Sequence, residues 1–190
     1  MKTGLKLYKK YRKVYAFTNL FLFYFRKFFI GFDVANQFIQ RVDKFSVQLI
    51  LKVNGAIIGK DCDIETGLVF HNCKNYSNLS VGDNCHIGKN CFFDLKDKII
   101  IGNNVVISMQ CSFITHIDMT QSKLSTIYPS LQKPIIISEN VYIGANSIIL
   151  MGVNIGKNSL VAAGSVIQKD VSINSFVGGV PAKEIKKLTL

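Results

Sequence analysis

The amino-acid sequence predicts an all-β fold, a parallel β-helix built from six-residue repeats and preceded by a helical N-terminal segment. An aliphatic or aromatic residue recurs every six positions, a glycine or another small residue often follows it, and the fifth position of each hexad carries a second small side chain. A helix with 3.6 residues per turn cannot keep a six-residue step on one face. Short repeats of this kind are typical of solenoids, in which each coil packs on its neighbours.

The six-residue step sets the register of the predicted coils. In the second half of the chain the repeat predicts one unbroken series of inward-facing residues: Ile137, Ile143, Ile149, Ile155, Val161, Ile167 and Ile173. Earlier sets are separated by small slips: Ile58, Ile64 and Phe70, then Val81, Ile87 and Phe93, then Ile101, Ile107 and Phe113. Three hexads make one coil, so the chain is predicted to turn a corner every six residues.

The fifth position of each hexad predicts a second, smaller side chain that points inward. Its occupants are Cys62, Leu68, Cys85, Cys91, Val105, Cys111, Val141, Ser147, Val153, Ser159, Ser165, Val171 and Val177. Four of the five cysteines fall in this slot, where cysteine acts as a compact apolar residue. Cys73 lies outside the pattern. An odd number of cysteines without metal-site spacing favours a reducing compartment over a disulfide framework, so we expect a cytoplasmic protein.

The segment before the coils is predicted to be helical. Residues 34–53 show apolar spacings of three and four, with Asp33 as the expected N-cap and Gly55 as the expected stop. Residues 2–32 are also expected to be helical, with apolar residues all around the axis. The apolar run 15–25 is too short to span a bilayer.

The domain boundaries follow from these patterns. We expect a basic, apolar helical extension over residues 1–55, a β-helix domain over 56–178 and a C-terminal tail over 179–190. Residues 117–134 break the repeat and are predicted to form a loop extruded from one coil. The first 54 residues carry eleven Lys/Arg and two acids out of a net charge of +11. Because the coils themselves are nearly neutral, the charge does not indicate a nucleic-acid partner.

Three histidines are candidates for a catalytic base. His86 is expected to face outward into solvent, and His71 to have a local role in a turn. His116 closes a coil immediately before the long loop, where a mobile cover would meet a rigid scaffold. We therefore predict that His116 is the general base of an acyl transfer. The three histidines occupy different hexad phases, which argues against a shared metal ion.

From Ile101 to Lys183 the chain resembles the hexapeptide-repeat acetyltransferases, in particular the maltose, galactoside and nodulation-sugar acetyltransferases and related polysaccharide O-acetyltransferases. The resemblance rests on an ordered set of motifs: Thr115-His116-Ile117-Asp118, Lys133-Pro134-Ile135, Asn140-Val141-Tyr142-Ile143-Gly144, Ala163 to Asp170, and Gly178 to Lys183. It implies a left-handed parallel β-helix, acetyl-CoA as acyl donor, a homotrimer and a saccharide acceptor. In this resemblance His116 matches the catalytic histidine.

The resemblance also implies the residues that bind acetyl-CoA. Tyr142 stands where the family usually has tryptophan near the thioester, beside Gly144. Ala145 and Ala163 match positions that hold the pantetheine arm through their backbone. The residues matched to the far end of CoA and to its phosphates are Gln168, Lys169, Lys183 and Lys186.

The acceptor is less well defined. Members that acetylate simple sugars carry an asparagine one coil before the histidine, and Gly88 aligns with it here, so Asn90 is the candidate replacement. Asp118 is a second candidate for acceptor binding. A weaker similarity of residues 64–71 to serine acetyltransferases gives a serine O-acetyltransferase-like enzyme as one alternative. A non-catalytic β-helix scaffold is another.

The basic, aromatic segment 1–32 leaves two interpretations open. It suits peripheral contact with anionic lipid on the inner face of the membrane, which would favour a lipid-linked saccharide acceptor and surface-polysaccharide biosynthesis. It also suits packing against a neighbouring subunit or against its own β-helix.

Overall fold

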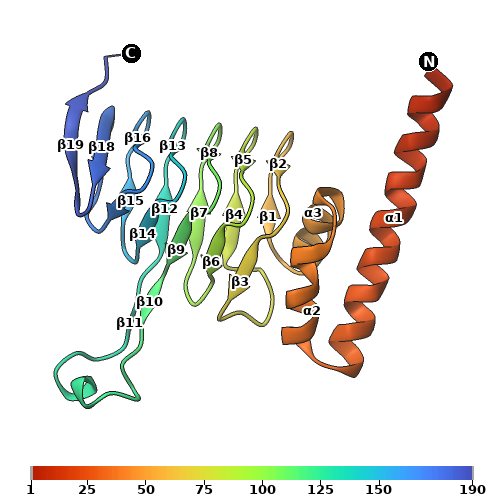
Figure 1. The fold of residues 1–190 in the computed structure, drawn as a ribbon, viewed down its shortest axis with the longest axis horizontal. Helices are drawn as coiled ribbons and strands as arrows, with labels where there is room; N and C mark the ends of the chain where they lie inside the picture. The colour runs from red at the N-terminus through yellow and green to blue at the C-terminus, as the bar shows by residue number, and fades with distance from the viewer. Residues whose placement is uncertain (1, 190) are drawn as a thin grey trace.

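The computed structural model describes residues 2–189, with side chains from residue 11 onward. Figure 1 shows a helical N-terminal unit at one end of a triangular prism of short strands, with a loop projecting from the prism. The helices are α1 (Lys2–Phe29), α2 (Phe32–Phe38), the 3-10 turn η1 (Ile39–Arg41) and α3 (Lys44–Val53). Among the described residues, none of the helices combines the length and apolar character needed to cross a bilayer.

The strands stack into three parallel faces, as the hexad repeat predicts. Face A contains β1 (Ile57–Ile58), β4 (Leu79–Val81), β7 (Ile99–Ile101), β12 (Ile135–Ile137) and β15 (Asn154–Ile155). Face B contains β2 (Asp63–Ile64), β5 (His86–Ile87), β8 (Val106–Ile107), β13 (Tyr142–Ile143), β16 (Leu160–Val161), β18 (Ser175–Gly179) and β19 (Ala182–Lys187). Face C contains β3 (Val69–His71), β6 (Phe92–Asp94), β9 (Ser112–Ile114), β14 (Ile148–Leu150) and β17 (Val166–Ile167).

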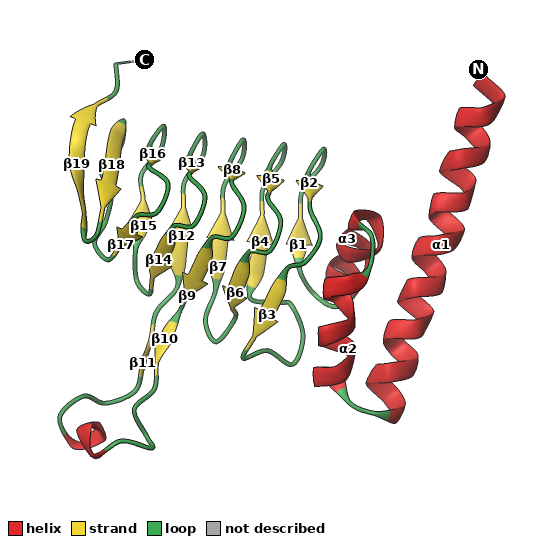
Figure 2. Cartoon of the chain, in the orientation of Figure 1, coloured by secondary structure: helices red, strands yellow, loops and turns green. Residues whose placement is uncertain are grey.

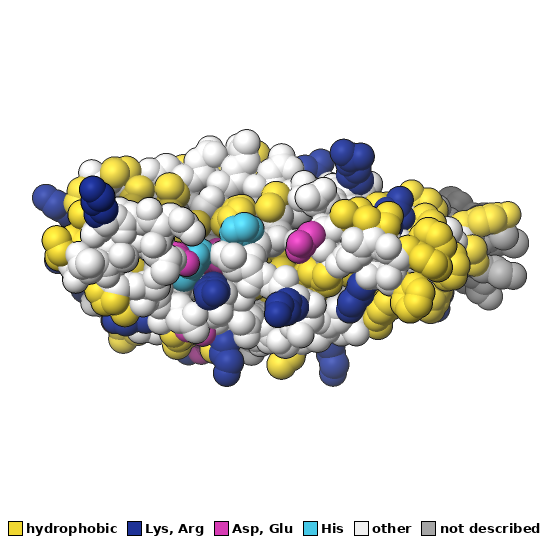
Figure 3. All heavy atoms as spheres, turned by 90° about the horizontal axis from the view of Figure 1, so that it is seen from below, with side chains coloured by type: hydrophobic (Ala, Val, Ile, Leu, Met, Phe, Trp, Pro, Cys, Tyr) yellow, Lys and Arg dark blue, Asp and Glu magenta, His cyan; other side chains and the backbone are white. Residues whose placement is uncertain are grey.

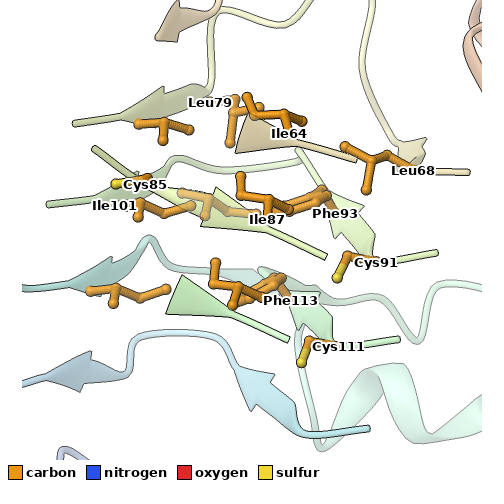
Figure 4. Packing of buried hydrophobic residues seen from close by; sticks show 14 of the residues in the cluster. Ile64, Leu68, Leu79, Cys85, Ile87, Cys91, Phe93, Ile101, Cys111 and Phe113 are labelled. Carbon is orange, nitrogen blue, oxygen red and sulfur yellow. The ribbon is translucent and has the colours of Figure 1, made fainter. Parts of the chain in front are cut away.

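The core is a set of columns that run along the prism. On face C, Phe93 stacks on Phe70 and Phe113 with ring centroids 5.6 and 5.0 Å apart. Figure 4 shows the rings of Phe93 and Phe113 and the neighbouring Ile87 pointing into the same interior. Stacked rings of this kind bury a large apolar area and hold successive coils in register.

The small fifth-position slot has a polar function as well as a steric one. The Cys85, Cys91 and Cys111 side chains are buried, and each sulfur lies 3.1–3.2 Å from a carbonyl oxygen of the next coil. Ser147 and Ser159 donate to next-coil carbonyls in the same way. Cysteine and serine therefore fill a narrow space and satisfy an acceptor there. The prediction of an inward structural role is confirmed for the three buried cysteines, while Cys62 is only half-buried.

The corners use two residue types for two reasons. A Cβ on Gly82 would lie 2.7 Å from the carbonyl carbon of Gly102, so successive coils touch backbone to backbone there. The left-handed turn itself is made two residues later by asparagine, as at Asn84 and Asn104, whose φ values are 55° and 56°. Asparagine tolerates this region better than most residues, and these side chains also hydrogen-bond from coil to coil at 2.9 Å.

One detail of the predicted register is wrong. Ile173 is 62% exposed, whereas Val171 and Val177 occupy the aliphatic positions opposite Ile155 and Val161. The register slips by two residues after Ile167, so the unbroken series ends there. The segment predicted only as a C-terminal tail contains β19, which pairs antiparallel with β18 and closes the end of face B.

The helix predicted over residues 34–53 is two helices. Val42 is extended at φ −92° and ψ 161°, and Asp43 caps α3 by accepting hydrogen bonds from the backbone N–H groups of Phe45 and Ser46. The N-cap of α2 is Gly31, not Asp33. The break lets α2 and α3 pack as separate elements between the first coil and α1 (Figure 2). The expected stop is present, since Gly55 has φ 106° immediately after α3.

Candidate active site

The turns that follow the strands of face C form one edge of the prism, which we call the C–A corner. The chain leaves this corner at β10 (His116–Ile117) and returns at β11 (Leu131–Gln132), which pair antiparallel as a two-stranded stalk. The 3-10 turn η2 (Lys123–Thr126) lies at the far end of the loop. The loop predicted over 117–134 is therefore present, and His116 stands at its base.

His116 forms a close pair with a carboxylate from the preceding coil. Its Nδ1 lies 2.6 Å from Asp94 Oδ2. The imidazole is 23% exposed, whereas the Asp94 side chain is 1% exposed. Because the carboxylate accepts at Nδ1, the proton of neutral His116 resides on Nδ1 and the lone pair is on Nε2. Nε2 is therefore the basic atom.

The Asp94 carboxylate is held in place by several donors. The backbone N–H of Thr115 donates to Oδ2 at 2.9 Å, and Asn72 Nδ2 donates to Oδ1 at 2.9 Å. Burial acts to raise the pKa of Asp94, but the hydrogen bonds from His116, Asn72 and Thr115 together bring this pKa below its usual value. Asp94 is therefore a buried anion at neutral pH.

Asn72 joins the pair from one coil further back. Its Nδ2 lies 3.4 Å from His116 Nε2, at the outer limit of a hydrogen bond. Asn72 adopts a left-handed backbone conformation with φ 53°, which turns its side chain toward the later coils. Three successive coils thus contribute Asn72, Asp94 and His116 to one site.

Neither Asp94 nor Asn72 is among the site residues predicted from the sequence. The available signal was an acidic residue directly after the inward-facing Phe93, at the end of a face C strand. That strand pairs with β9, which ends two residues before His116.

The other two histidines lie elsewhere on the prism. His86 is on face B, where its Nδ1 is 3.4 Å from Asp63 Oδ2 and its side chain is 41% exposed. His71 ends β3 at the C–A corner and pairs in register with Asp94. Cys73 follows in the same turn, and burial raises the pKa of its thiol to about 11, which keeps it protonated at neutral pH.

Asp118 anchors the loop. Its Oδ1 accepts from the Thr120 backbone N–H at 2.9 Å and from the Ser130 hydroxyl at 2.8 Å. The Thr120 side chain and backbone, together with Ser130, lower the pKa of Asp118 to about 2. These contacts tie the two sides of the loop together above the stalk. Contact of Asp118 with an acceptor stays a prediction.

The residues predicted to hold the pantetheine arm lie together, but on the other side of face C. Gly144, Ala145 and Ala163 meet at the corner between faces B and C, where the Gly164 N–H donates to the Ala145 carbonyl at 2.8 Å. A Cβ on Gly144 would lie 2.5 Å from Ala163 N, so no larger residue fits there. We call these three residues the cofactor strip.

Aromatic and basic residues border the cofactor strip. Tyr142 is exposed on β13 of face B, and Lys183 and Lys186 are exposed on β19. Lys183 pairs with Gly178, which packs against Ala162 next to the strip. The strip therefore has little side-chain bulk and lysines at one end. Such a surface fits an extended chain that carries phosphates.

The remaining predicted residues are divided between the two corners. Gln168 and Lys169 follow β17 at the C–A corner, on the same edge as His116. Asn90 lies at the B–C corner, in the turn before β6, whereas Asp94 ends that strand. The structure places Asp94, not Asn90, beside His116. Within one chain, face C separates the cofactor strip from the base.

A polar pocket of about 550 Å³ lies beside the site, between α2 and β3. Asp33, Gln37 and Gln40 line it from the helical side, and His71 and Asn72 line it from the coil. Figure 3 shows histidine and acidic side chains gathered along this face, between the projecting loop and the apolar helical end. Asn72 lines this pocket, and its Nδ2 also lies 3.4 Å from His116 Nε2, so Asn72 links the pocket to the histidine.

No group of three or more His, Cys, Asp or Glu side chains that could hold a metal ion occurs in the part of the chain that the structure describes.

Comparison with known sequences places the chain among proteins with this repeat. A family model described as the hexapeptide repeat of succinyl-transferase matches residues 78–109 and 134–169. Galactoside O-acetyltransferase of Escherichia coli K12 is 30% identical over 145 residues, which cover 73% of this chain and 67% of the relative. Relatives from Saccharomyces cerevisiae and Schizosaccharomyces pombe are each 37% identical, and the chain spans 60% and 55% of their lengths.

Solved structures show the same architecture. A maltose O-acetyltransferase from Clostridium difficile 630 superposes with a TM-score of 0.71 at 27% identity, covering 82% of this chain and 83% of that one. A hexapeptide-repeat acetyltransferase from Vibrio cholerae, complexed with acetyl-coenzyme A, has a TM-score of 0.58 at 26% identity and covers 77% and 78%. The predicted left-handed parallel β-helix with an N-terminal helical segment is confirmed.

Proposed function

Because the chain belongs to the hexapeptide-repeat acetyltransferases, we propose that it transfers an acetyl group from acetyl-coenzyme A to a hydroxyl group of a saccharide. The observation that carries the proposal is the pair formed by His116 and the buried Asp94, which leaves the lone pair of the partly exposed imidazole on Nε2. An amino group on the sugar is the second candidate nucleophile, since the same base would serve it.

His116 provides the proton transfers of the reaction. Bound acetyl-CoA supplies an acyl carbonyl activated as a thioester. Nε2 accepts the hydroxyl proton as the acceptor oxygen bonds to that carbonyl carbon, and it returns the proton to the sulfur when the carbon–sulfur bond breaks. Asp94 keeps the other proton on Nδ1 and stabilises the imidazolium that forms between the two steps.

The cofactor strip fits the donor. Gly144, Ala145 and Ala163 leave a surface without bulky side chains, along which a pantetheine arm can lie. Lys183 and Lys186 provide positive charge for the phosphates of coenzyme A. Tyr142 offers a ring next to the thioester end.

Separation of the strip from His116 supports an active site shared between two copies. The C–A corner and the cofactor strip are different surfaces of one prism, so a copy that presents its strip to the His116 of a neighbour makes a head-to-tail contact. Such contacts close into a ring when the rotation permits. The family resemblance gives three copies as the number that closes the ring.

We expect a mass near three times 21.2 kDa by light scattering in mild detergent.

We also expect complementation between two inactive variants, His116→Ala and Ala163→Trp. Ala163 is exposed, so a large ring there would block the strip without disturbing the core. Refolding a one-to-one mixture should restore activity at about a quarter of the sites, those with an intact residue from each copy. A mixture as inactive as its parts would show that each chain holds a complete site.

The polar pocket supports a saccharide as acceptor. Amide and carboxylate side chains match the donors and acceptors of sugar hydroxyls, and the pocket volume suits a small saccharide unit. Release of free thiol from acetyl-CoA, followed over a panel of sugars, nucleotide sugars and serine, tests the acceptor class directly. Activity on serine alone would contradict the saccharide assignment.

Substitution in the pocket should affect the acceptor and not the donor. Replacing Gln37 and Gln40 together with alanine removes two hydrogen-bonding side chains from α2. We expect the acceptor KM to rise about thirtyfold, since two neutral hydrogen bonds contribute about 1 kcal/mol each, while the KM for acetyl-CoA stays within a factor of two or so. Val34→Ala is the matched control, because Val34 is exposed on α2 outside this pocket. Equal effects of both changes would contradict an acceptor role.

A further inference from the structure

We propose that α1 docks the protein on an anionic membrane surface through one exposed aromatic face. Val14, Phe17, Phe21, Phe25 and Phe28 make up this aromatic face, and their side chains are 49–84% exposed. Their spacings of three and four residues place all five on one side of the helix. An exposed apolar surface this continuous marks a site of interaction.

The opposite side of α1 is already occupied, so the helix cannot simply turn its rings inward. Ala16, Asn19 and Phe23 are buried against the other helices. Asn19 Nδ2 donates to Ser46 Oγ at 3.0 Å, and the ring of Phe23 packs edge-to-face on Phe32 at 6.4 Å between centroids. These contacts fix the rotation of α1 about its axis and direct the aromatic face outward.

The charge of the segment selects anionic lipid as the occupant. Residues 1–32 contain eight Lys/Arg and no acid. Arg26 and Lys27 lie behind the aromatic face, because the Arg26 guanidinium stacks 4.1 Å above Phe38 and Lys27 Nζ lies 3.2 Å from Asn54 Oδ1. The other six Lys/Arg stand between positions 2 and 13, at the start of α1. A cluster of cations on the same helix as a stripe of rings is typical of helices that lie in the plane of the lipid headgroups.

The direction of α1 favours binding by several copies at once. The helix runs across the end of the prism, with α2 and α3 between it and the first coil (Figures 1 and 2). Copies that assemble side by side through their prism faces would therefore present all their α1 helices at the same end. One flat surface could then engage each helix, and the linked contacts would strengthen one another.

The location of the polar pocket suggests why such docking would be useful. The pocket is lined by α2, which packs directly on α1, so it opens near the end of the prism that would face the membrane. A lipid-linked saccharide on the cytoplasmic leaflet would then reach the pocket from the surface to which the enzyme is bound. This last step rests on the proposed function, whereas docking itself does not.

The test is flotation of the full-length protein with lipid vesicles. We expect binding to phosphatidylcholine vesicles that contain about 30% phosphatidylserine, weaker binding to pure phosphatidylcholine, and partial release at about 0.5 M NaCl. The triple variant Phe21→Ser, Phe25→Ser, Phe28→Ser should have an affinity for the anionic vesicles that is lower by at least about tenfold, since it removes apolar surface from the aromatic face only. Ile127→Ser with Tyr128→Ser, on the exposed loop, is the matched control.

Circular dichroism, light scattering and activity on a water-soluble acceptor should be unchanged in the triple variant. Wild-type protein that does not float, or a triple variant that floats equally well, would overturn the proposal. Loss of the native mass in the triple variant would overturn it too, because the aromatic face would then be a subunit contact. Inactivity of the wild-type protein on every acceptor would reject the proposed function and leave the flotation result standing.

Discussion

Replacement of His116 with alanine is expected to lower turnover by about two to four orders of magnitude, the usual loss on removal of a general base. The fold should survive, because the side chain is partly exposed at the base of the stalk and the β10–β11 pairing uses only the backbone. Steady-state kinetics with acetyl-CoA and a saturating acceptor measures the effect, and circular dichroism with light scattering checks the fold and mass.

The other two histidines serve as controls for this prediction. His86→Ala removes an imidazole that also pairs with a carboxylate, but on face B, and should leave turnover within a factor of two or so. His71 lines the polar pocket, so the His71→Ala change should raise the acceptor KM more than it lowers kcat. If His116→Ala stayed active while either of the others lost turnover, a different histidine would be the base.

Replacement of Asp94 with asparagine is expected to lower kcat by about ten- to a thousandfold while the KM for acetyl-CoA changes little. Asparagine keeps the shape but removes the charge that fixes the proton on Nδ1 and stabilises the imidazolium.

The Asp94→Asn change also affects the stability of the fold. Because the folded pKa of Asp94 is lowered, its carboxylate stabilises the fold above the unfolded pKa of about 3.9, and this contribution is lost as pH falls through the folded value.

Two measurements separate these effects. Denaturant unfolding of wild-type protein and Asp94→Asn should show the larger gap in stability at pH 7, with the gap narrowing in acid. Kinetics at pH 7 on folded protein should show the loss in kcat without a parallel loss of acetyl-CoA affinity. An Asp94→Asn enzyme with normal kcat would reduce Asp94 to a structural residue.

Much of the prism could be predicted from sequence because side-chain direction in a β-helix is a local property. A six-residue step specifies which residue of each short strand faces the interior, and Phe93 or Cys91 need no knowledge of distant coils to be assigned inward. The loop and the position of His116 at its base followed from where that step was interrupted. The six-residue step wrongly predicts that Ile173 faces inward. The register slips by two residues there, and this slip can be recognised only when the strand that pairs with the segment is known.

The N-terminal unit shows a second limit. The apolar spacing across residues 34–53 continues through the break, so periodicity alone indicates one helix. Asp43 instead begins a separate helix, because its carboxylate accepts hydrogen bonds from two backbone N–H groups that a continuous helix would have bonded internally.

The sequence by itself determined the repeat, the small inward slot, the extruded loop and His116 as candidate base, since each depends on residues near one another in the chain. Only the tertiary structure brought Asn72 and Asp94 to His116, separated the cofactor strip from that base, and turned the aromatic face of α1 outward. These features depend on how coils stack and on which side of a helix its neighbours cover. Stacking follows from the number of residues in each coil, which here varies, so no single spacing in the sequence reveals it.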